Sequence, residues 1–243
     1  MIRKENNGIV WFEFEQLQPF AHIGHAVFSR KAATQCLDLS MQQTANKRAA
    51  FTAINLPTKC KEIHGNQVHK DGVFLATEKD PEYIDSCDAF ISNTPHRALC
   101  IRHADCQAAF FYDMRNNSIA AVHCGWRGSV KNIYKKTIDE MILHFGSRPE
   151  DLLACICPSL GPNAAQFIHY ETELPHAFWQ FQTKPAYFDF WNISRWQLEN
   201  EGIRREHIEI AEMCTFENKE LFFSYRRDKS TERNMSTIWI NQK

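Results

Sequence analysis

The chain has 243 residues, of which 44% are hydrophobic and 12% aromatic, and its formal net charge is −1. That composition is typical of a globular domain and excludes a disordered chain. The near-zero charge argues against nucleic acid as a partner, and no apolar run is long enough to span a membrane. No signal peptide is visible at the start, and the nine cysteines are expected to be mostly free thiols of a cytoplasmic protein.

The predicted elements mix strands and helices without a strict strand–helix–strand alternation. Strands are predicted in residues 20–30, in two parts of 60–77, and in 98–114, 118–126, 151–162, 207–212, 221–228 and 235–240, and helices in 40–54, 130–145, 172–181 and 193–202. Ser40 or Thr44 is expected to cap the first helix, and Ser129 and Gly146 to bound the second. This order predicts an α+β (mixed α-β) fold with helices outside mixed sheets. No linker or repeat divides the chain, so one domain is expected.

Three possible metal ligands lie at predicted strand ends beside turns. His64 precedes Gly65, Cys106 interrupts a long apolar run, and His123 ends the segment "AAVH". Two imidazoles and a thiolate suit Zn²⁺, and a site with three protein ligands leaves a position open for water or substrate. The alternative is that these are three unrelated core residues, because buried cysteines are common.

Charged groups near these residues in the sequence are candidates for catalysis and substrate binding. Asp105 precedes Cys106, and its carboxylate is a candidate for proton transfer. Arg30 and Arg127 are candidates to hold a phosphate or carboxylate through bidentate hydrogen bonds, although an ordinary surface ion pair is the alternative for each. The histidines His69 and His103 are expected to be bystanders.

Five segments, in this order, resemble the laccase-domain family, also called multicopper polyphenol oxidase or YfiH-like proteins. They are "EIHGNQV", "HADC", "AAVHCGWRG", "SLGP" and "FFSYRRD", and the resemblance runs from residue 25 to residue 240. It implies a single domain over residues 1–243, built as a four-layer α/β/β/α sandwich. It also implies one metal site per chain, with His64, Cys106 and His123 as ligands.

The resemblance further implies a zinc-dependent purine nucleoside phosphorylase. Its small-molecule partners would be phosphate and a nucleoside, namely adenosine, inosine or methylthioadenosine, and adenosine deaminase activity is implied as well. The family name also implies an alternative, a copper-dependent polyphenol oxidase that binds Cu²⁺. A third possibility is a metal-binding accessory or editing protein that turns over no nucleoside.

The histidine content disfavours the oxidase alternative. Reduction of dioxygen needs several coppers and many histidine ligands, commonly as His-x-His pairs, whereas this chain has eleven histidines and no such pair. A single His₂Cys site resembles a blue-copper centre but cannot carry a four-electron reduction. Nucleoside chemistry is therefore the favoured prediction.

Three segments depart from the family pattern near the expected substrate site. The family's Thr-Ala-Asp-Cys-x-Pro is "HADCQA" here, with His103 for Thr and Ala108 for Pro. The segment "KAATQC" at 31–36 replaces a glycine-rich loop, and "CPSLGPNAAQ" at 157–166 also differs. The ligand residues are retained, so metal binding is expected more firmly than the identity of the substrate.

The neighbours His123 and Cys124 are separated by strand geometry. Successive residues in a strand point to opposite faces, so only one of the two can face a site. His123 matches the family's histidine, whereas the family has alanine at the position of Cys124. His123 is therefore the expected ligand, and Cys124 is expected to pack in the core.

Overall fold

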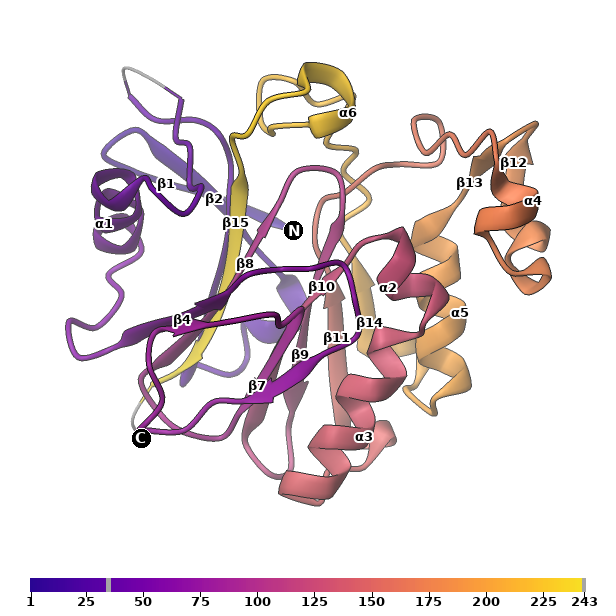
Figure 1. Ribbon diagram of the computed structural model, residues 1–243. Coiled ribbons are helices and arrows are strands. Elements are labelled where there is room, and N and C mark those ends of the chain that lie inside the picture. The colour runs from indigo at the N-terminus through magenta and orange to yellow at the C-terminus, as the bar shows by residue number, and fades with distance from the viewer. Residues whose placement is uncertain (34–35, 242–243) are drawn as a thin grey trace.

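The computed structural model describes residues 1–33 and 36–241, and it contains two packed β-sheets between helices (Figure 1). Residues 34 and 35 of the segment "KAATQC" lie outside the described residues. The strands are β1 Ile2–Asn6, β2 Ile9–Glu13, β3 Ile23–Phe28, β4 Lys61–Gly65, β5 Val73–Leu75, β6 Tyr83–Ile84, β7 Ala89–Ser92, β8 Arg97–His103, β9 Gln107–Asp113, β10 Ser118–Cys124, β11 Leu152–Ile156, β12 Gln182–Lys184, β13 Tyr187–Phe188, β14 Ile208–Ile210 and β15 Asn234–Ile240. The α-helices are α1 Thr44–Ala53, α2 Trp126–Val130, α3 Ile133–Phe145, α4 Tyr170–Glu173, α5 Phe190–Asn200 and α6 Tyr225–Asp228, and short 3₁₀ helices cover Glu15–Leu17, Pro149–Asp151, His176–Phe181 and Arg205–His207.

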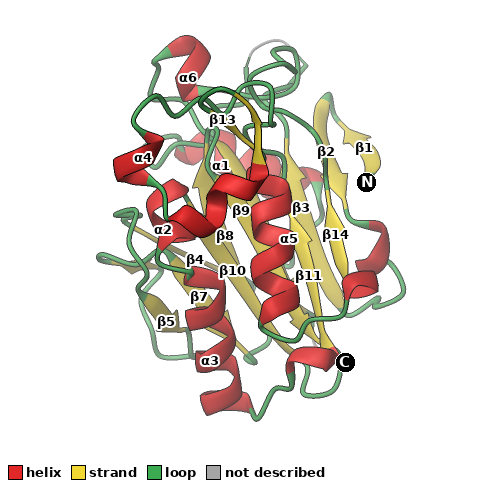
Figure 2. Cartoon of the chain, turned by 90° about the vertical axis from the view of Figure 1, so that its right-hand side faces the viewer, coloured by secondary structure: helices red, strands yellow, loops and turns green. Residues whose placement is uncertain are grey.

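Both large sheets are mixed, and together with the helices they confirm the predicted four-layer α/β/β/α fold. One sheet has seven strands in the order β1-β2-β3-β15-β8-β4-β6, and the other has six in the order β14-β11-β9-β10-β7-β5. In the first sheet β8 is antiparallel to β15 and parallel to β4, and in the second β7 is antiparallel to β10 and parallel to β5. Helix α1 covers the seven-stranded sheet, and α3 and α5 cover the six-stranded one (Figures 1 and 2).

The central strands are buried on both faces, which explains their almost continuous apolar sequences. In β8, Leu99 and Ile101 pack between the two sheets, whereas Ala98 and Cys100 pack toward α1. In β9, Phe110 packs between the sheets and its neighbour Phe111 packs toward α3. Three hydrophobic layers therefore hold the four structural layers together.

Several sequence predictions fail, some because consecutive strands belong to different sheets and others because of local helix signals. The two strands predicted in 60–77 belong to different sheets, as do β8 and β9, which a short turn divides within the predicted strand 98–114. Residues 221–228 were expected to be a strand but contain α6, which Ser224 caps by accepting a hydrogen bond from the Arg227 backbone N–H. The helix expected in 172–181 is divided into α4 and a 3₁₀ turn that follows Pro175.

The helix boundaries are partly as predicted. Gly146 ends α3 in a left-handed conformation, with φ of 67°, which confirms its predicted role. Ser129 does not cap α3, because it lies buried in the separate helix α2, and Asn132 instead accepts a hydrogen bond from the Lys135 backbone N–H. Helix α1 begins after Gln43, whose side chain makes no capping hydrogen bond.

No helix in the described part of the chain combines the length and the apolar character needed to cross a lipid bilayer.

The histidine of β3 is expected to make stability depend on pH. His25 is buried, and its Nε2 accepts a hydrogen bond from the Phe14 backbone N–H at 2.8 Å. Burial lowers the pKa of His25 to about 4, against the opposing charge of Glu13. Because the unfolded histidine binds a proton below about pH 6.5, this group's contribution is complete above that pH and is lost as the pH falls toward 4.

We therefore expect this group to lower the free energy of unfolding by about 2 kcal/mol between pH 7 and pH 5. Urea titrations at both pH values should show a shallower pH dependence for His25→Gln than for the wild type. His144→Gln, which changes an exposed histidine on α3, is the matched control and should keep the wild-type dependence. An unchanged pH dependence in His25→Gln would contradict the assignment.

Candidate metal centre and adjoining cavities

A cluster of two histidines and a cysteine lies where the two sheets meet. One potential ligand atom from each of His69, Cys106 and His123 lies within 4.8 Å of the others. His69 comes from the loop between β4 and β5, Cys106 from the turn between β8 and β9, and His123 from the end of β10. Within residues 1–33 and 36–241, this is the one group of at least three such side chains arranged to hold a metal ion.

The buried carboxylate of Asp88 holds two of the three donors. It accepts hydrogen bonds from the backbone N–H groups of Val68, His69 and Lys70 at 3.2, 2.9 and 2.8 Å. Its Oδ1 also lies 2.8 Å from Nδ1 of His123, which leaves Nε2 of that ring for another partner. One acidic side chain thus orients a ligand ring and shapes the loop that carries another.

Gly125 provides the space in which the donors approach one another. A Cβ atom at this position would lie 3.1 Å from Sγ of Cys106 and 3.1 Å from Cδ2 of His69. These distances are tighter than ordinary van der Waals contact, so even alanine would press on both side chains. This contact explains the glycine that follows His123 and Cys124.

The electrostatics of the cluster favour a thiolate. Burial opposes ionisation of Cys106, but hydrogen bonds from His123 and His69 prevail and lower the pKa of its thiol to about 6. Burial likewise opposes protonation of His123, but Asp88 and Cys106 raise the pKa of its imidazole to about 9. A thiolate is the form in which cysteine binds metals, and a metal ion bound here would displace the proton from His123.

The structure does not bring the predicted ligand His64 into this cluster. His64 lies in β4 with its Nδ1 3.2 Å from Oε1 of Glu62 and its ring against Tyr83. His69, which was expected to be a bystander, occupies the corresponding place beside Cys106 and His123. The strand ends at Gly65, and His69 reaches the cluster from the following loop with a left-handed φ of 58°.

The other predicted site residues are distributed between the cluster and the protein core. Cys124 is not part of the donor cluster: it packs in the core beneath α3, and it also lies in the wall of a cavity that adjoins Cys106. Asp105 lies next to the cluster with φ of 91°, and its carboxylate accepts hydrogen bonds from Thr215 Oγ1 at 2.8 Å and from the Arg226 backbone N–H at 2.6 Å. Each oxygen of Asp105 therefore accepts one hydrogen bond, and any role in proton transfer would have to use the remaining lone pairs.

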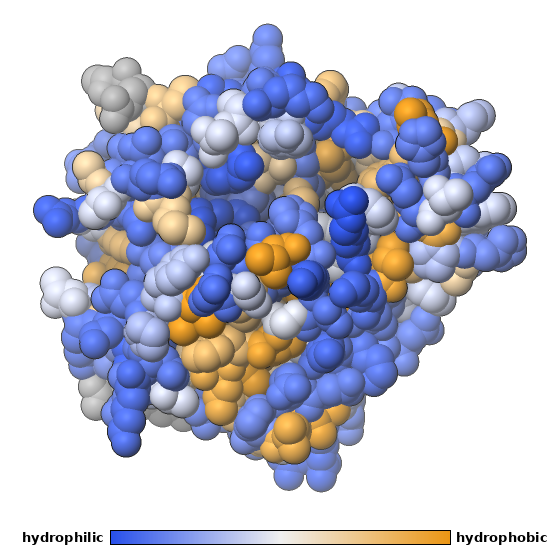
Figure 3. Space-filling view, viewed as in Figure 1, coloured by the Kyte–Doolittle hydropathy of each residue, from blue (hydrophilic) through white to orange (hydrophobic). Residues whose placement is uncertain are grey.

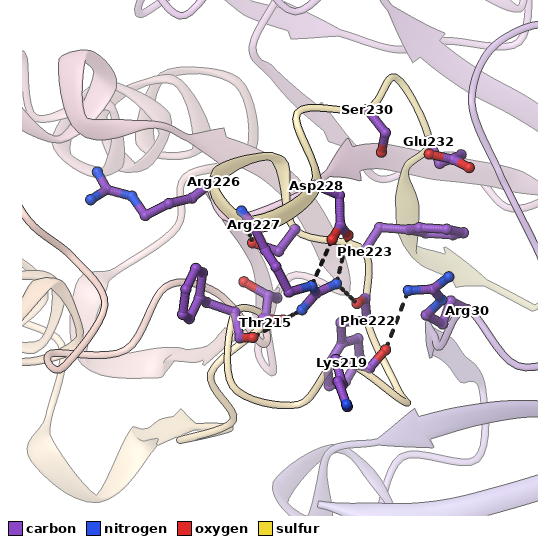
Figure 4. A network of polar contacts seen from close by, with 12 residues as sticks. Arg30, Thr215, Lys219, Phe222, Phe223, Arg226, Arg227, Asp228, Ser230 and Glu232 are labelled. Atoms are coloured by element: carbon purple, nitrogen blue, oxygen red, sulfur yellow. Dashed lines mark hydrogen bonds and ion pairs between the residues drawn. The ribbon is translucent and has the colours of Figure 1, made fainter.

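The two predicted anion-binding arginines lie away from the cluster. Arg30 packs over the Phe223 ring and donates a hydrogen bond to the Lys219 carbonyl oxygen (Figure 4). It also donates to Sγ of Cys36. Arg127 stacks on Trp126, with its guanidinium carbon 4.2 Å from the ring centroid. In the described part of the chain, neither arginine lines a cavity that reaches Cys106.

Two cavities adjoin Cys106, on a face whose surface is hollowed beneath the α6 segment (Figure 3). The first has a volume of about 550 Å³ and is lined by aromatic rings. The second has a volume of about 450 Å³ and contains the other two donors, His69 and His123. Ala104, Cys106 and Tyr225 line both cavities, so the turn between β8 and β9 separates them. The first cavity's rings belong to Trp126, Phe167, Phe190 and Tyr225.

Fold and site together define a two-sheet mixed α/β protein with a candidate His–Cys–His metal centre at the meeting of its sheets. The family model described as "Multi-copper polyphenol oxidoreductase laccase" matches residues 27–241, and the chain belongs to this family.

Relatives of the chain carry phosphorylase names. It is 32% identical over 223 residues to "Purine nucleoside phosphorylase YfiH" of Shigella flexneri, covering 87% of this chain and 86% of that protein. The protein of the same name from Escherichia coli (strain K12) is 31% identical with the same coverage. A crystal structure of a Bacillus licheniformis hypothetical protein YfiH matches with a TM-score of 0.86 at 20% identity, over 98% of this chain and 99% of that one, and supports the fold alone.

Substitution of the two competing histidines should distinguish the ligand sets. We expect His69→Ala to lose most of its bound metal, because two remaining ligands make a poor site. His64→Ala should keep its metal, because His64 belongs to the neighbouring Glu62 and Tyr83 group. Elemental analysis of both variants after the same purification gives the measurement. Metal retained in His69→Ala and lost in His64→Ala would reverse the assignment.

Removal of the Asp88 charge should weaken the site without removing a donor. We expect Asp88→Asn to bind metal about 10- to 100-fold more weakly, because the negative charge beside the His123 ring is lost and one of the two oxygens that hold this ring and the His69 loop becomes an NH₂ donor. Asp113→Asn is the matched control. Asp113 is also buried and accepts hydrogen bonds from backbone N–H groups, but it lies at the end of β9 that is far from Cys106. Equal affinities in the two variants, measured by competition with a chelator, would contradict this role for Asp88.

Proposed function

We propose that this protein is a metal-dependent purine nucleoside phosphorylase that acts on adenosine, inosine or methylthioadenosine. The proposal rests on one observation: the cluster of His69, Cys106 and His123 adjoins a cavity that is lined by aromatic rings. A purine is flat and apolar on its faces, so stacking against Trp126 or Phe167 would bind it. The phosphorylase names of the relatives support the same conclusion.

The donor set fits one Zn²⁺ per chain. Its two imidazoles and one thiolate are borderline and soft ligands that zinc prefers, and three protein ligands leave a position open. The hydrogen bond from His123 to Asp88 fits the second layer of contacts that orients metal-binding histidines. A zinc ion held there would supply Lewis acidity toward a substrate atom.

Phosphorolysis exchanges one bond at the sugar for another. A phosphate oxygen forms a bond to the anomeric carbon while the bond from that carbon to the base nitrogen breaks. The electron pair of the broken bond passes to the base, which takes up the proton that hydrogen phosphate gives up. The protein's part is to stack the base, hold the sugar near Cys106 and position the phosphate for attack.

The oxidase implied by the family name has less support. The described residues contain one cluster of His, Cys, Asp or Glu donors suited to a metal, whereas dioxygen reduction by a laccase requires several copper ions. Adenosine deamination would use the same cavity with water in place of phosphate. One assay can test both reactions. A metal-binding accessory protein would have the cluster without turnover.

A nucleoside assay with and without phosphate tests the proposal. We expect free base and a sugar phosphate to form from adenosine, inosine or methylthioadenosine only when phosphate is present. Chromatography separates free base from inosine, so the same samples reveal deamination. Cys106→Ala should be inactive, whereas Cys155→Ala, which alters a buried cysteine between the sheets, should retain activity. Base release without phosphate, or no product at all, would exclude a phosphorylase.

A further inference from the structure

The second cavity beside Cys106 differs in charge from the first. The first cavity is lined by the basic side chains Arg226 and Lys229 but also by the carboxylates Asp105 and Glu173. The second is lined by Arg102 and Arg233, and none of its described lining residues is acidic. A cavity with two guanidinium groups and no carboxylate in its wall is suited to an anion.

Arg102 retains hydrogen-bonding capacity at the wall of this cavity. Only 8% of the residue is exposed, and its Nη2 donates to the Gly65 carbonyl oxygen at 2.8 Å, whereas its buried Nη1 has no hydrogen-bond partner. The charge of the nearby acid Glu62 acts on Arg102, but no hydrogen bond joins the two residues: Oε2 of Glu62 lies 2.9 Å from Nζ of Lys47, and Oε1 lies 3.2 Å from Nδ1 of His64. A buried guanidinium donor without an acceptor is costly, and an oxygen of a bound anion would satisfy it.

His103 has a second unpartnered atom in the wall of the same cavity. It is 1% exposed, its Nε2 lies 2.8 Å from Oγ of Ser236, and its Nδ1 has no hydrogen-bond partner. Burial lowers the pKa of both Arg102 and His103, and the positive charge of Arg233 acts in the same direction on each, as does His123 on His103. An anion placed here would offset the repulsion between the two guanidinium groups of Arg102 and Arg233.

Two arginines nearer the surface, Arg30 and Arg227, do not have a buried guanidinium nitrogen without a hydrogen-bond partner. Arg227 donates to the carbonyl oxygens of Thr215, Phe216 and Phe222 and forms an ion pair with Asp228 (Figure 4). The guanidinium of Arg30 donates to the Lys219 carbonyl oxygen and to Sγ of Cys36. Their guanidinium groups therefore support the loop before α6. Arg102 alone among these three has a buried donor nitrogen without a partner.

The two cavities meet at the place where the reaction is proposed to occur. In phosphorolysis the phosphate and the base lie on opposite sides of the anomeric carbon, so their sites must flank one point. Ala104, Cys106 and Tyr225 line both cavities and mark such a point. The aromatic cavity is suited to the base, and the basic cavity lies on the other side of this boundary.

We infer that the second cavity is the phosphate subsite, with Arg102 and Arg233 holding the oxyanion. Nη1 of Arg233 already donates to the carbonyl oxygens of Ser230 and Glu232, so its other N–H groups are the ones available to the anion. This inference rests on the proposed function for the role of the anion as a substrate. Binding of inorganic phosphate itself does not depend on turnover, because the subsite is present without a nucleoside.

Calorimetric titration of the metal-loaded protein with inorganic phosphate, at constant ionic strength, tests the inference directly. We expect Arg102→Gln and Arg233→Gln each to weaken phosphate binding about tenfold or more, because each removes a charge-assisted hydrogen bond. Metal content should stay at the wild-type level. Arg233 is only partly buried, so its variant keeps the test decisive if Arg102→Gln fails to fold.

Arg30→Gln is the matched control, because Arg30 lies in a different basic cavity with Lys219 and Arg227. We expect it to bind phosphate as the wild type does. In an active enzyme, the two test variants should raise KM for phosphate and leave KM for the nucleoside near its wild-type value. The inference is overturned if the wild type binds no phosphate, or if both test variants bind it as tightly as the wild type. A wild type that binds phosphate through Arg102 and Arg233 but releases no base would refute the phosphorylase and retain the anion site.

Discussion

The candidate site depends on the buried carboxylate of Asp88. Three consecutive backbone N–H groups of the loop around His69 converge on it, and His123 adds a fourth hydrogen bond through its ring. Burial raises the pKa of a carboxyl group, but these donors prevail and hold the pKa of Asp88 below its ordinary value. The loop and the ring therefore share one anchor, and the position of each donor depends on the other.

The fold class and the positions of the central strands followed from the sequence because they depend on local patterns. The continuous apolar runs of β8 to β11 mark strands buried on both faces, and Gly146 marks the end of a helix. What the pattern did not reveal is where the chain changes sheets. A turn such as the one at Asp105 looks like an interruption in one long strand, although it separates two sheets.

The site was predictable only in part, for a related reason. Cys106 and His123 could be found because each stands beside a strand in a recognisable segment, and the structure brings these two together. His69 was missed in favour of His64 because its position depends on a contact with Asp88, which lies 19 residues further along the chain. Arg102 was missed because a charged residue inside an apolar run says nothing about which of its hydrogen bonds will be satisfied.

The connections between the sheets place the donors on both sides of the central core. His69 follows β4 of the seven-stranded sheet, Cys106 lies between β8 of that sheet and β9 of the other, and His123 ends β10 of the six-stranded sheet. The distances between the three donor atoms therefore depend on how the two sheets pack against each other. A change of side-chain volume at Phe110, in the core between the sheets, would therefore be expected to alter the spacing of the three donor atoms.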